Sequence, residues 1–179
     1  MISDNLATGD IIKEFEKTFA NYFGKSFSAI FVSSGTSALE IILRYLNIGE
    51  GDEVIMSSFL NASPLQAVVN LKAKPILIDI DEDNFQISMD NVIEAINEKT
   101  KAIIVSHMFG NCALIDELAD IKVPVIEDAS HSLGGKYRDT LLGSFGDFAY
   151  FSFSATRMIT SGGAGGMILT KKKGMDAIR

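Results

Sequence analysis

Three loops of this chain bring together hydroxyl, carboxylate, imidazole and guanidinium groups, and each follows a short apolar run that predicts a buried strand. They span residues 33–37, 127–131 and 152–166. In open parallel sheets, ligands bind at the carboxyl ends of strands, so the loops that follow the strands are expected to carry the chemistry. The three loops are therefore the candidate functional site.

The first loop has the sequence Ser-Ser-Gly-Thr-Ser and leads into a predicted helix. Gly35 allows a tight turn, and the exposed N–H groups and hydroxyls of Thr36 and Ser37 at a helix start suit a phosphate. The same residues are also typical of an ordinary helix N-cap, which remains an alternative. The loop is not a P-loop, because no Gly-Lys-Ser/Thr follows.

The second loop contains Asp128 and, three residues later, His131. A carboxylate at the end of a buried strand is costly unless it meets a cation, and a pyridinium N–H would be a good partner. His131 is placed to contact the same ligand. A metal site is disfavoured, because the chain has two histidines and no second cluster of acidic residues and histidine. Asp128 as the cap of the next turn stays open.

The third loop contains Ser152 and Arg157 and ends in a glycine-rich run, residues 162–166. A lysine amine can lose its proton and attack an aldehyde, whereas arginine keeps its proton up to a pKa of about 12 or more. The glycine run precedes a strand, so it is not a dinucleotide fingerprint, which follows a strand and opens a helix. It predicts either a turn that admits a ligand or a tight bend. No Gly-x-Ser-x-Gly motif is present, which sets hydrolase functions aside.

Short apolar runs alternate with segments of helical period along the chain. The runs predict strands at 29–32, 53–56, 75–78, 102–105, 123–126, 148–153 and 167–169. Between them, apolar residues at three- and four-residue spacing predict amphipathic helices around 38–46, 65–69, 92–96 and 114–121, after an opening helix at 11–22. Strands that are apolar on both faces and joined by helices indicate an α/β fold with a mostly parallel, doubly wound sheet.

Composition excludes several classes of partner. The net charge of −7 and the pI near 4.8 disfavour nucleic acid and an anionic membrane surface, since both select for clustered Lys and Arg. The single cysteine, Cys112, cannot form an internal disulfide, and the N-terminus does not resemble a signal peptide. No apolar stretch approaches the roughly 20 residues that span a bilayer. A cytoplasmic location is expected.

An ordered series of motifs covers nearly the whole chain and resembles one family. The series comprises residues 34–39 (Ser-Gly-Thr-Ser-Ala-Leu), 51–55 (Gly-Asp-Glu-Val-Ile), 107–110 (His-Met-Phe-Gly), 126–131 (Ile-Glu-Asp-Ala-Ser-His) and 143–147 (Gly-Ser-Phe-Gly-Asp). It is similar to the large domain of the DegT/DnrJ family of sugar aminotransferases, which use pyridoxal phosphate (PLP) and have the aspartate aminotransferase fold, fold type I. The resemblance implies that residues 1–179 form this large domain, without the small C-terminal domain.

The resemblance also implies roles for individual residues. Gly35, Thr36, Ser37 and Ser152 would hold the PLP phosphate. Phe59 would lie over the pyridine ring, although it could equally be an ordinary core phenylalanine. Asp128 would pair with the protonated ring nitrogen, and His131 would lie near the ring hydroxyl or beside the ring. His107, which follows a buried strand, is expected to be structural or to support the site.

The chain departs from the family pattern at three places. Arg157 stands at the position of the Schiff-base lysine, so the covalent link to the cofactor and the proton transfer that the lysine performs are expected to be lost. Ala164 stands where many members have an acidic residue. The third departure is the expected absence of the small C-terminal domain. Separately, residues 174–179 look like the start of a helix that is cut short.

The function implied by the resemblance is amino transfer from an amino acid to a nucleotide-linked keto-sugar, as in the biosynthesis of cell-surface polysaccharides or secondary-metabolite sugars. Because of Arg157, the chain is expected to be catalytically impaired and to bind PLP or pyridoxamine phosphate (PMP) non-covalently, as a homodimer. Two other classes stay open: a non-catalytic partner subunit that binds a sugar nucleotide or the cofactor, and a phosphate-ligand module unrelated to PLP.

Overall fold

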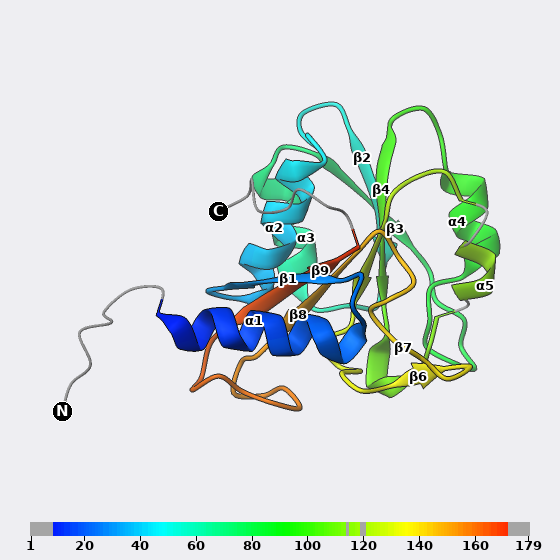
Figure 1. Cartoon of the computed structure of the whole chain (residues 1–179). Helices are drawn as coiled ribbons and strands as arrows, with labels where there is room; N and C mark the ends of the chain where they lie inside the picture. Colours follow the sequence, from blue (N-terminus) through cyan, green and yellow to red (C-terminus); the bar gives the residue numbers. More distant parts are fainter. Residues whose placement is uncertain (1–8, 114, 119–120, 172–179) are drawn as a thin grey trace.

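Seven strands form one sheet in the computed structural model, which describes residues 9–113, 115–118 and 121–171 (Figure 1). The strands are β1 (Ser28–Val32), β2 (Glu53–Ser57), β3 (Lys74–Ile78), β4 (Thr100–Ser106), β5 (Val125–Asp128), β8 (Phe148–Ser152) and β9 (Gly166–Thr170). The helices are α1 (Asp10–Phe23), α2 (Gly35–Tyr45), α3 (Ala62–Asn70), α4 (Met89–Ala95) and α5 (Ile115–Leu118), with a 3-10 turn η1 (Met108–Gly110). The helix start expected at 174–179 lies outside the described residues.

The sheet has the order β1-β9-β8-β5-β4-β2-β3. Strands β8, β5, β4, β2 and β3 pair in parallel, whereas β9 is antiparallel to both of its neighbours. The prediction of a mostly parallel sheet is confirmed. A parallel pair needs a long crossover, usually a helix. The segment from β8 to β9 contains no helix, and β9 returns antiparallel beside β8, whereas the helix-free segment from β5 to β8, which carries the hairpin of residues 136–141, joins a parallel pair.

Helices cover both faces of the sheet. Successive residues of a strand point to opposite faces, so Val54 and Ile104 belong to a core cluster with α2 and α3, whereas Ile55 and Ile103 pack in a second cluster with Val92 of α4. A third cluster, on the same face as the second, joins α1 to β8 and β9. This arrangement confirms the predicted doubly wound fold.

The opening helix α1 is held by aromatic side chains. Phe19 is buried, and its ring centroid lies 5.0 Å from that of Phe151 on β8. Phe15 contacts Phe31 of β1 and Phe153 after β8, at centroid distances of 5.8 and 5.6 Å. Because these rings belong to α1, β1 and the end of β8, they fix the part of the sheet that presents the first and third loops.

A small hairpin between β5 and β8 was not predicted. It consists of β6 (Lys136–Tyr137) and β7 (Thr140–Leu141), joined by Arg138 and Asp139, both of which have positive φ. No helix in the described part of the chain is long and apolar enough to cross a membrane.

Candidate functional site

The ends of three strands and the start of a fourth meet at one edge of the sheet. Gly166, the first residue of the antiparallel strand β9, pairs with Val32 at the end of β1 and with Ser152 at the end of β8. Asp128 ends β5, the next strand in the sheet. The three loops that the sequence singles out therefore come together at this edge.

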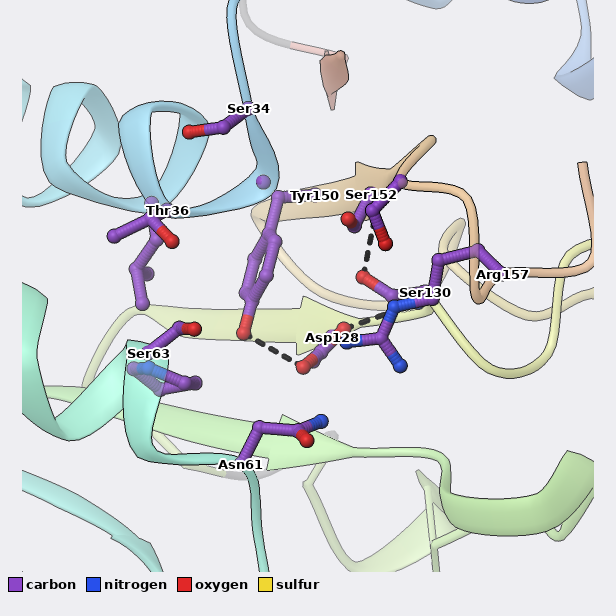
Figure 2. A pocket seen from close by; sticks show the side chains of 13 residues that line it. Ser34, Thr36, Asn61, Ser63, Asp128, Ser130, Tyr150, Ser152 and Arg157 are labelled. Atoms are coloured by element: carbon purple, nitrogen blue, oxygen red, sulfur yellow. Dashed lines mark hydrogen bonds between the residues drawn. The ribbon is translucent and has the colours of Figure 1, made fainter. Parts of the chain in front are cut away.

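A cavity of about 200 Å³ opens between these strand ends and the N-termini of α2 and α3 (Figure 2). The residues that line it come from four segments of the chain: Ser34, Gly35, Thr36, Leu39, Asn61, Ser63, Pro64, Asp128, Ser130, Tyr150, Ser152, Ser154 and Arg157. Hydroxyl groups are frequent among them, and Asp128 and Arg157 supply opposite charges. The cavity therefore suits a ligand that carries both an anionic group and a cationic or hydrogen-bond-donating group.

The N-terminus of α2 forms one end of the cavity. Ser34 caps the helix in extended backbone, and its Oγ accepts a hydrogen bond from the N–H of Ser37 at 3.0 Å. The N–H groups of a first helical turn point out of the helix and, with the helix dipole, favour an anion. The Thr36 and Ser152 side chains lie beside this helix end (Figure 2). This end of the cavity is the candidate phosphate site.

Two glycines allow the backbone segments at this end to approach closely. A Cβ on Gly35 would lie 2.8 Å from the Cβ of Ser152, and a Cβ on Gly166 would lie 2.3 Å from the carbonyl oxygen of Ser34. Both distances are too short for side-chain atoms. Glycine at these positions therefore allows the start of α2 to pack against β8 and β9. For Gly166, at the end of the glycine-rich run, this favours the tight bend over the ligand-admitting turn, the two alternatives that the sequence left open.

Asp128 lies at the other end of the cavity, almost fully buried. Its Oδ1 accepts a hydrogen bond from the N–H of Ser130 at 3.0 Å, and its Oδ2 accepts one from the Tyr150 hydroxyl at 2.7 Å. Burial and the charge of Asp128 raise the pKa of Tyr150 well above its ordinary value, so the phenol stays protonated and donates. A buried carboxylate held by donors is an acceptor for a protonated ring nitrogen.

Arg157 and His131 lie together beside the carboxylate. The guanidinium Nη1 of Arg157 contacts both ring nitrogens of His131, and Asn61 Nδ2 lies 3.2 Å from His131 Nε2. Burial and then the positive charge of Arg157 lower the pKa of His131, opposed in part by Asp128. The imidazole is therefore neutral at pH 7, and Arg157 carries the positive charge of this corner.

The structure brings together five of the predicted site residues, which line the cavity: Gly35, Thr36, Asp128, Ser152 and Arg157. Ser37 is outside the lining, and its hydroxyl is hydrogen-bonded to those of Ser33 and Ser34 at 3.0 and 2.9 Å. His131 is also outside the lining, in contact with Arg157 and Asn61. Roles for Ser37 and His131 in contact with a ligand stay predictions.

Phe59 is also outside the cavity lining. Its ring, 39% exposed, packs against Phe85 and Phe109 at centroid distances of 5.9 and 6.1 Å. Asn61, two residues later and at the N-cap of α3, is the residue of this loop that lines the cavity. The expected position of Phe59 over a ligand ring thus stays a prediction, which requires the ring to turn toward the cavity.

Sequence reasoning missed several lining residues, among them Tyr150, Asn61 and Ser130. Tyr150 was counted with an apolar run, and only the register of β5 against β8 places it beside Asp128. Ser130 Oγ accepts a hydrogen bond from the N–H of Ser152 at 3.0 Å, which joins the second loop to the third. The alternation of side chains along each strand is the signal from which Tyr150 and Asp128 could have been predicted to lie on the same face of the sheet.

Glu127, next to Asp128, points to the other face of the sheet and is completely buried. Its carboxylate accepts hydrogen bonds from His107 Nε2 and from the N–H groups of Gly143, Phe145 and Gly146, at 2.6–2.8 Å. His107 Nδ1 in turn accepts from the N–H of Ala113 at 3.3 Å. His107 is therefore part of a buried network that holds the strand end carrying Asp128.

The residues at the cavity fit the two ends of PLP or PMP. The start of α2, with Gly35, Thr36 and Ser152, lines one end of the cavity and suits a phosphate, and the Asp128 carboxylate lines the same cavity. Arg157 Nε is buried without a hydrogen-bond partner among the described residues, so this corner has a donor left for a ligand. Within the same part of the chain, no group of three or more His, Cys, Asp or Glu side chains could hold a metal ion.

A mostly parallel, doubly wound sheet with a helix start suited to phosphate and a carboxylate at a neighbouring strand end defines the class of PLP-dependent transferases of fold type I. The chain belongs to the DegT/DnrJ/EryC1/StrS aminotransferase family, whose sequence profile matches residues 1–178. The resemblance drawn from the sequence motifs is confirmed.

Known proteins similar to this chain are about twice its length. An uncharacterised protein of Methanocaldococcus jannaschii is 40% identical over 172 residues, which cover 94% of this chain and 44% of that protein. GDP-perosamine synthase of Escherichia coli O157:H7 is 36% identical, with 92% and 46% covered. A putative sugar aminotransferase of Streptococcus pneumoniae, solved in PMP and PLP forms, is 31% identical with a TM-score of 0.86; its PMP form aligns over 93% of this chain and 46% of that one. The chain thus spans about half the length of the relatives it matches.

Proposed function

We propose that this chain is the cofactor-binding domain of a PLP-dependent aminotransferase that acts on nucleotide-linked keto-sugars. The observation that carries the proposal is the cavity with the start of α2 and Ser152 at one end, Asp128 at the other, and Arg157 beside it. The division of the chain, residues 1–179 as this domain alone, and a cytoplasmic location stay predictions.

In this proposal, the chain's own groups bind and orient the cofactor. The first turn of α2, with Thr36 and Ser152, holds the phosphate, and Asp128 accepts a hydrogen bond from the ring nitrogen. When bound, PLP supplies an electron sink for the carbon that loses its proton. Asp128 sustains that property because it keeps the ring nitrogen protonated.

Arg157 is proposed to leave the chain without turnover. Its guanidinium stays protonated near neutral pH and is a poor nucleophile, so it neither forms the covalent link nor moves the proton that a lysine would move. His131 beside it is neutral, but a ring in contact with Arg157 and Asn61 is committed to those contacts. Non-covalent binding of PLP or PMP is the expected state.

The substrate class follows from the relatives. Two GDP-perosamine synthases, from Escherichia coli and Caulobacter vibrioides, are 36% and 38% identical to this chain. Their similarity supports a nucleotide-linked keto-sugar as the amino acceptor and an amino acid as the donor, in the biosynthesis of polysaccharide or secondary-metabolite sugars.

Binding of PMP tests the proposal, because PMP uses the phosphate and ring-nitrogen contacts without a Schiff base. We expect Asp128→Ala to weaken PMP binding by about 10- to 100-fold in calorimetry, since a hydrogen bond to a charged group contributes about 1.5–3 kcal/mol. Inorganic phosphate should bind equally well to both proteins. The matched control is Asp116→Ala, because Asp116 also accepts a 2.7 Å hydrogen bond from a tyrosine, Tyr137, but lies outside the cavity.

Two outcomes would contradict this proposal. A parent chain that binds phosphate but shows no additional affinity for PMP would favour the phosphate-ligand module unrelated to PLP. Equal PMP affinity of the parent and Asp128→Ala would show that the Asp128 carboxylate does not bind the ring nitrogen.

We also propose that the chain forms a homodimer through an aromatic cluster beside the site. The cluster consists of Phe59, Phe85 and Phe109, which are 39%, 45% and 67% exposed and come from the loops after β2, β3 and β4. Phe85 and Phe109 have positive φ, which is uncommon for bulky residues. Exposed apolar patches often mark association sites. We expect the parent to be a dimer at micromolar concentration in light scattering, and Phe109→Glu to be a monomer.

The control for this experiment is Ile93→Glu, which places the same charge at another exposed apolar residue, 55% exposed on α4. The control should remain a dimer. A parent that scatters as a monomer, or a Phe109→Glu variant that stays dimeric, would refute the role of the cluster.

A further inference from the structure

The phenol of Tyr150 is an unassigned group at the centre of the site. Tyr150 lies on β8 directly opposite Asp128 in the parallel pairing of β5 with β8, and only 3% of its surface is exposed. Figure 2 shows its hydroxyl directed at the Asp128 carboxylate, to which it donates a 2.7 Å hydrogen bond. Its ring also lines the cavity, so it is in place to act on any ligand that reaches Asp128.

Tyr150 and Ser130 together fix the plane of the Asp128 carboxylate. Each carboxylate oxygen receives one donor, the phenol on Oδ2 and the Ser130 N–H on Oδ1. An ionised carboxylate has about four acceptor positions, so two remain for a ligand. Both donors restrict the rotation of the carboxylate. The result is an oriented carboxylate with free acceptor positions that lines the cavity.

The neighbouring cation gives this orientation a consequence. Arg157 and His131 lie beside Asp128. The charge of Asp128 acts on His131, and the charge of Arg157 acts on both His131 and Tyr150. In the described part of the chain, the Asp128 carboxylate makes no ion pair with Arg157, and it accepts its hydrogen bonds from Tyr150 and Ser130. A carboxylate freed from the phenol could turn toward the guanidinium and be neutralised there.

We propose that Tyr150 is a positioning residue that holds Asp128 as an oriented anion for a protonated ring nitrogen. This inference rests on the proposed binding of PLP or PMP. It assigns to Tyr150 a part in selecting the charge state of the ligand. A phosphate ligand whose ring nitrogen carries a proton gains affinity from Asp128, whereas a phosphate without such a ring binds only as well as inorganic phosphate.

The test compares Tyr150→Phe with the parent, using PMP labelled with ¹⁵N at the ring nitrogen and, separately, inorganic phosphate. Removing the hydroxyl should weaken PMP binding roughly tenfold, the lower end of the loss expected for Asp128→Ala, because the carboxylate remains but is no longer held toward the ring nitrogen. The ¹⁵N resonance of bound PMP should move from the protonated toward the unprotonated position. Phosphate affinity should not change.

Tyr137→Phe is the matched control, because it removes a phenol that donates a hydrogen bond of the same length, 2.7 Å, to Asp116 away from the cavity. It should change neither readout. If Tyr150→Phe does not fold, Tyr150→Met gives the same two readouts, since methionine fills irregular core space.

An unchanged ¹⁵N shift and unchanged PMP affinity in a folded Tyr150 variant would overturn the positioning role while leaving the proposed function intact. Failure of the proposed function is distinguishable, because the parent itself would then bind phosphate without binding PMP, and the assignment of Tyr150 would fall with it. An equal loss of phosphate affinity in the variant would show a general disturbance of the cavity and would also refute the proposal.

Discussion

Replacing Arg157 by lysine is expected to convert a chain that holds PLP non-covalently into one that PLP labels at residue 157. The side chain at this position lies in the cavity beside His131, near both Asp128 and the phosphate site. A primary amine here would be held next to a cofactor aldehyde that its phosphate and ring nitrogen already orient. Such proximity is worth effective concentrations of about 10⁵ M or more.

The measurement is absorbance followed by mass spectrometry. Arg157→Lys mixed with PLP should develop the yellow band of a protonated Schiff base, and borohydride should then fix a phosphopyridoxyl group on residue 157. The parent should show neither at this residue. Thr156→Lys is the matched control, because it places the same amine one residue away on an exposed side chain.

A lysine variant that binds PLP without a reducible link would mean that residues 152–166 do not form the cofactor-anchoring loop. A reduced adduct at a native lysine of the parent would equally contradict the assignment, because it would show that the chain retains an anchor. Restored amino transfer is a separate matter, since it also depends on substrate contacts.

The layers of the fold could be predicted from the sequence, because buried parallel strands are apolar on both faces. The run at 102–105 gave β4 (Thr100–Ser106), and the run at 75–78 gave β3 (Lys74–Ile78), each with an error of one or two residues at the ends. The pattern carries no sign of strand direction, however. Residues 167–169 are equally apolar in a parallel and an antiparallel strand, so the reversal of β9 could be seen only in the pairing.

The β6–β7 hairpin escaped prediction because its turn lacks the usual residues. Two-residue turns of this kind favour Asn-Gly or Asp-Gly, since both central residues take positive φ. Here Arg138 and Asp139 adopt φ of 45° and 65° without glycine. Contacts supplement the turn, since Arg138 pairs with Asp116 at 2.9 Å and lies over the ring of Tyr137.

Those residues of the candidate site could be predicted whose residue type by itself indicates their chemistry. Asp128 was found because a charge at a buried strand end needs a partner, and Arg157 because it stands at the position where the family resemblance places the Schiff-base lysine. Asn61 and Tyr150 were not, because their roles depend on direction. Ser57 Oγ accepts a hydrogen bond from the N–H of Phe59 at 3.0 Å in a local turn, and Asn61 follows with its side chain at the cavity. The residue types of Phe59 and Asn61 do not indicate which of these two side chains lines the cavity.

The largest effect on stability is expected from Glu127→Gln. The carboxylate accepts four hydrogen bonds, and an amide at the same place would direct its NH₂ group at some of the donors, His107 and the N–H groups of residues 143, 145 and 146. Buried groups left without partners are costly, and breaking a buried charged network typically costs about 3–5 kcal/mol. We expect a loss of this size in urea unfolding at pH 7.

The pH dependence of this difference identifies its cause. Burial by itself raises the pKa of Glu127, but the hydrogen bond and charge of His107 and the N–H groups of Gly146 and Gly143 outweigh burial and lower it. A carboxylate whose pKa is lowered on folding stabilises the protein above its unfolded pKa, about 4.3. That contribution is lost as the pH falls through the lower folded pKa. The difference between parent and Glu127→Gln should therefore be constant above about pH 5 and shrink in acid.

Glu40→Gln is the control for this prediction. Glu40 accepts a 2.8 Å hydrogen bond from Arg44 one helical turn later on α2, in an exposed pair, and such pairs contribute less than about 1 kcal/mol. Its loss should be small at every pH. A Glu127→Gln variant within about 1 kcal/mol of the parent at pH 7 would show that the donors find water or other acceptors, and that the network does not hold the strand end on which Asp128 stands.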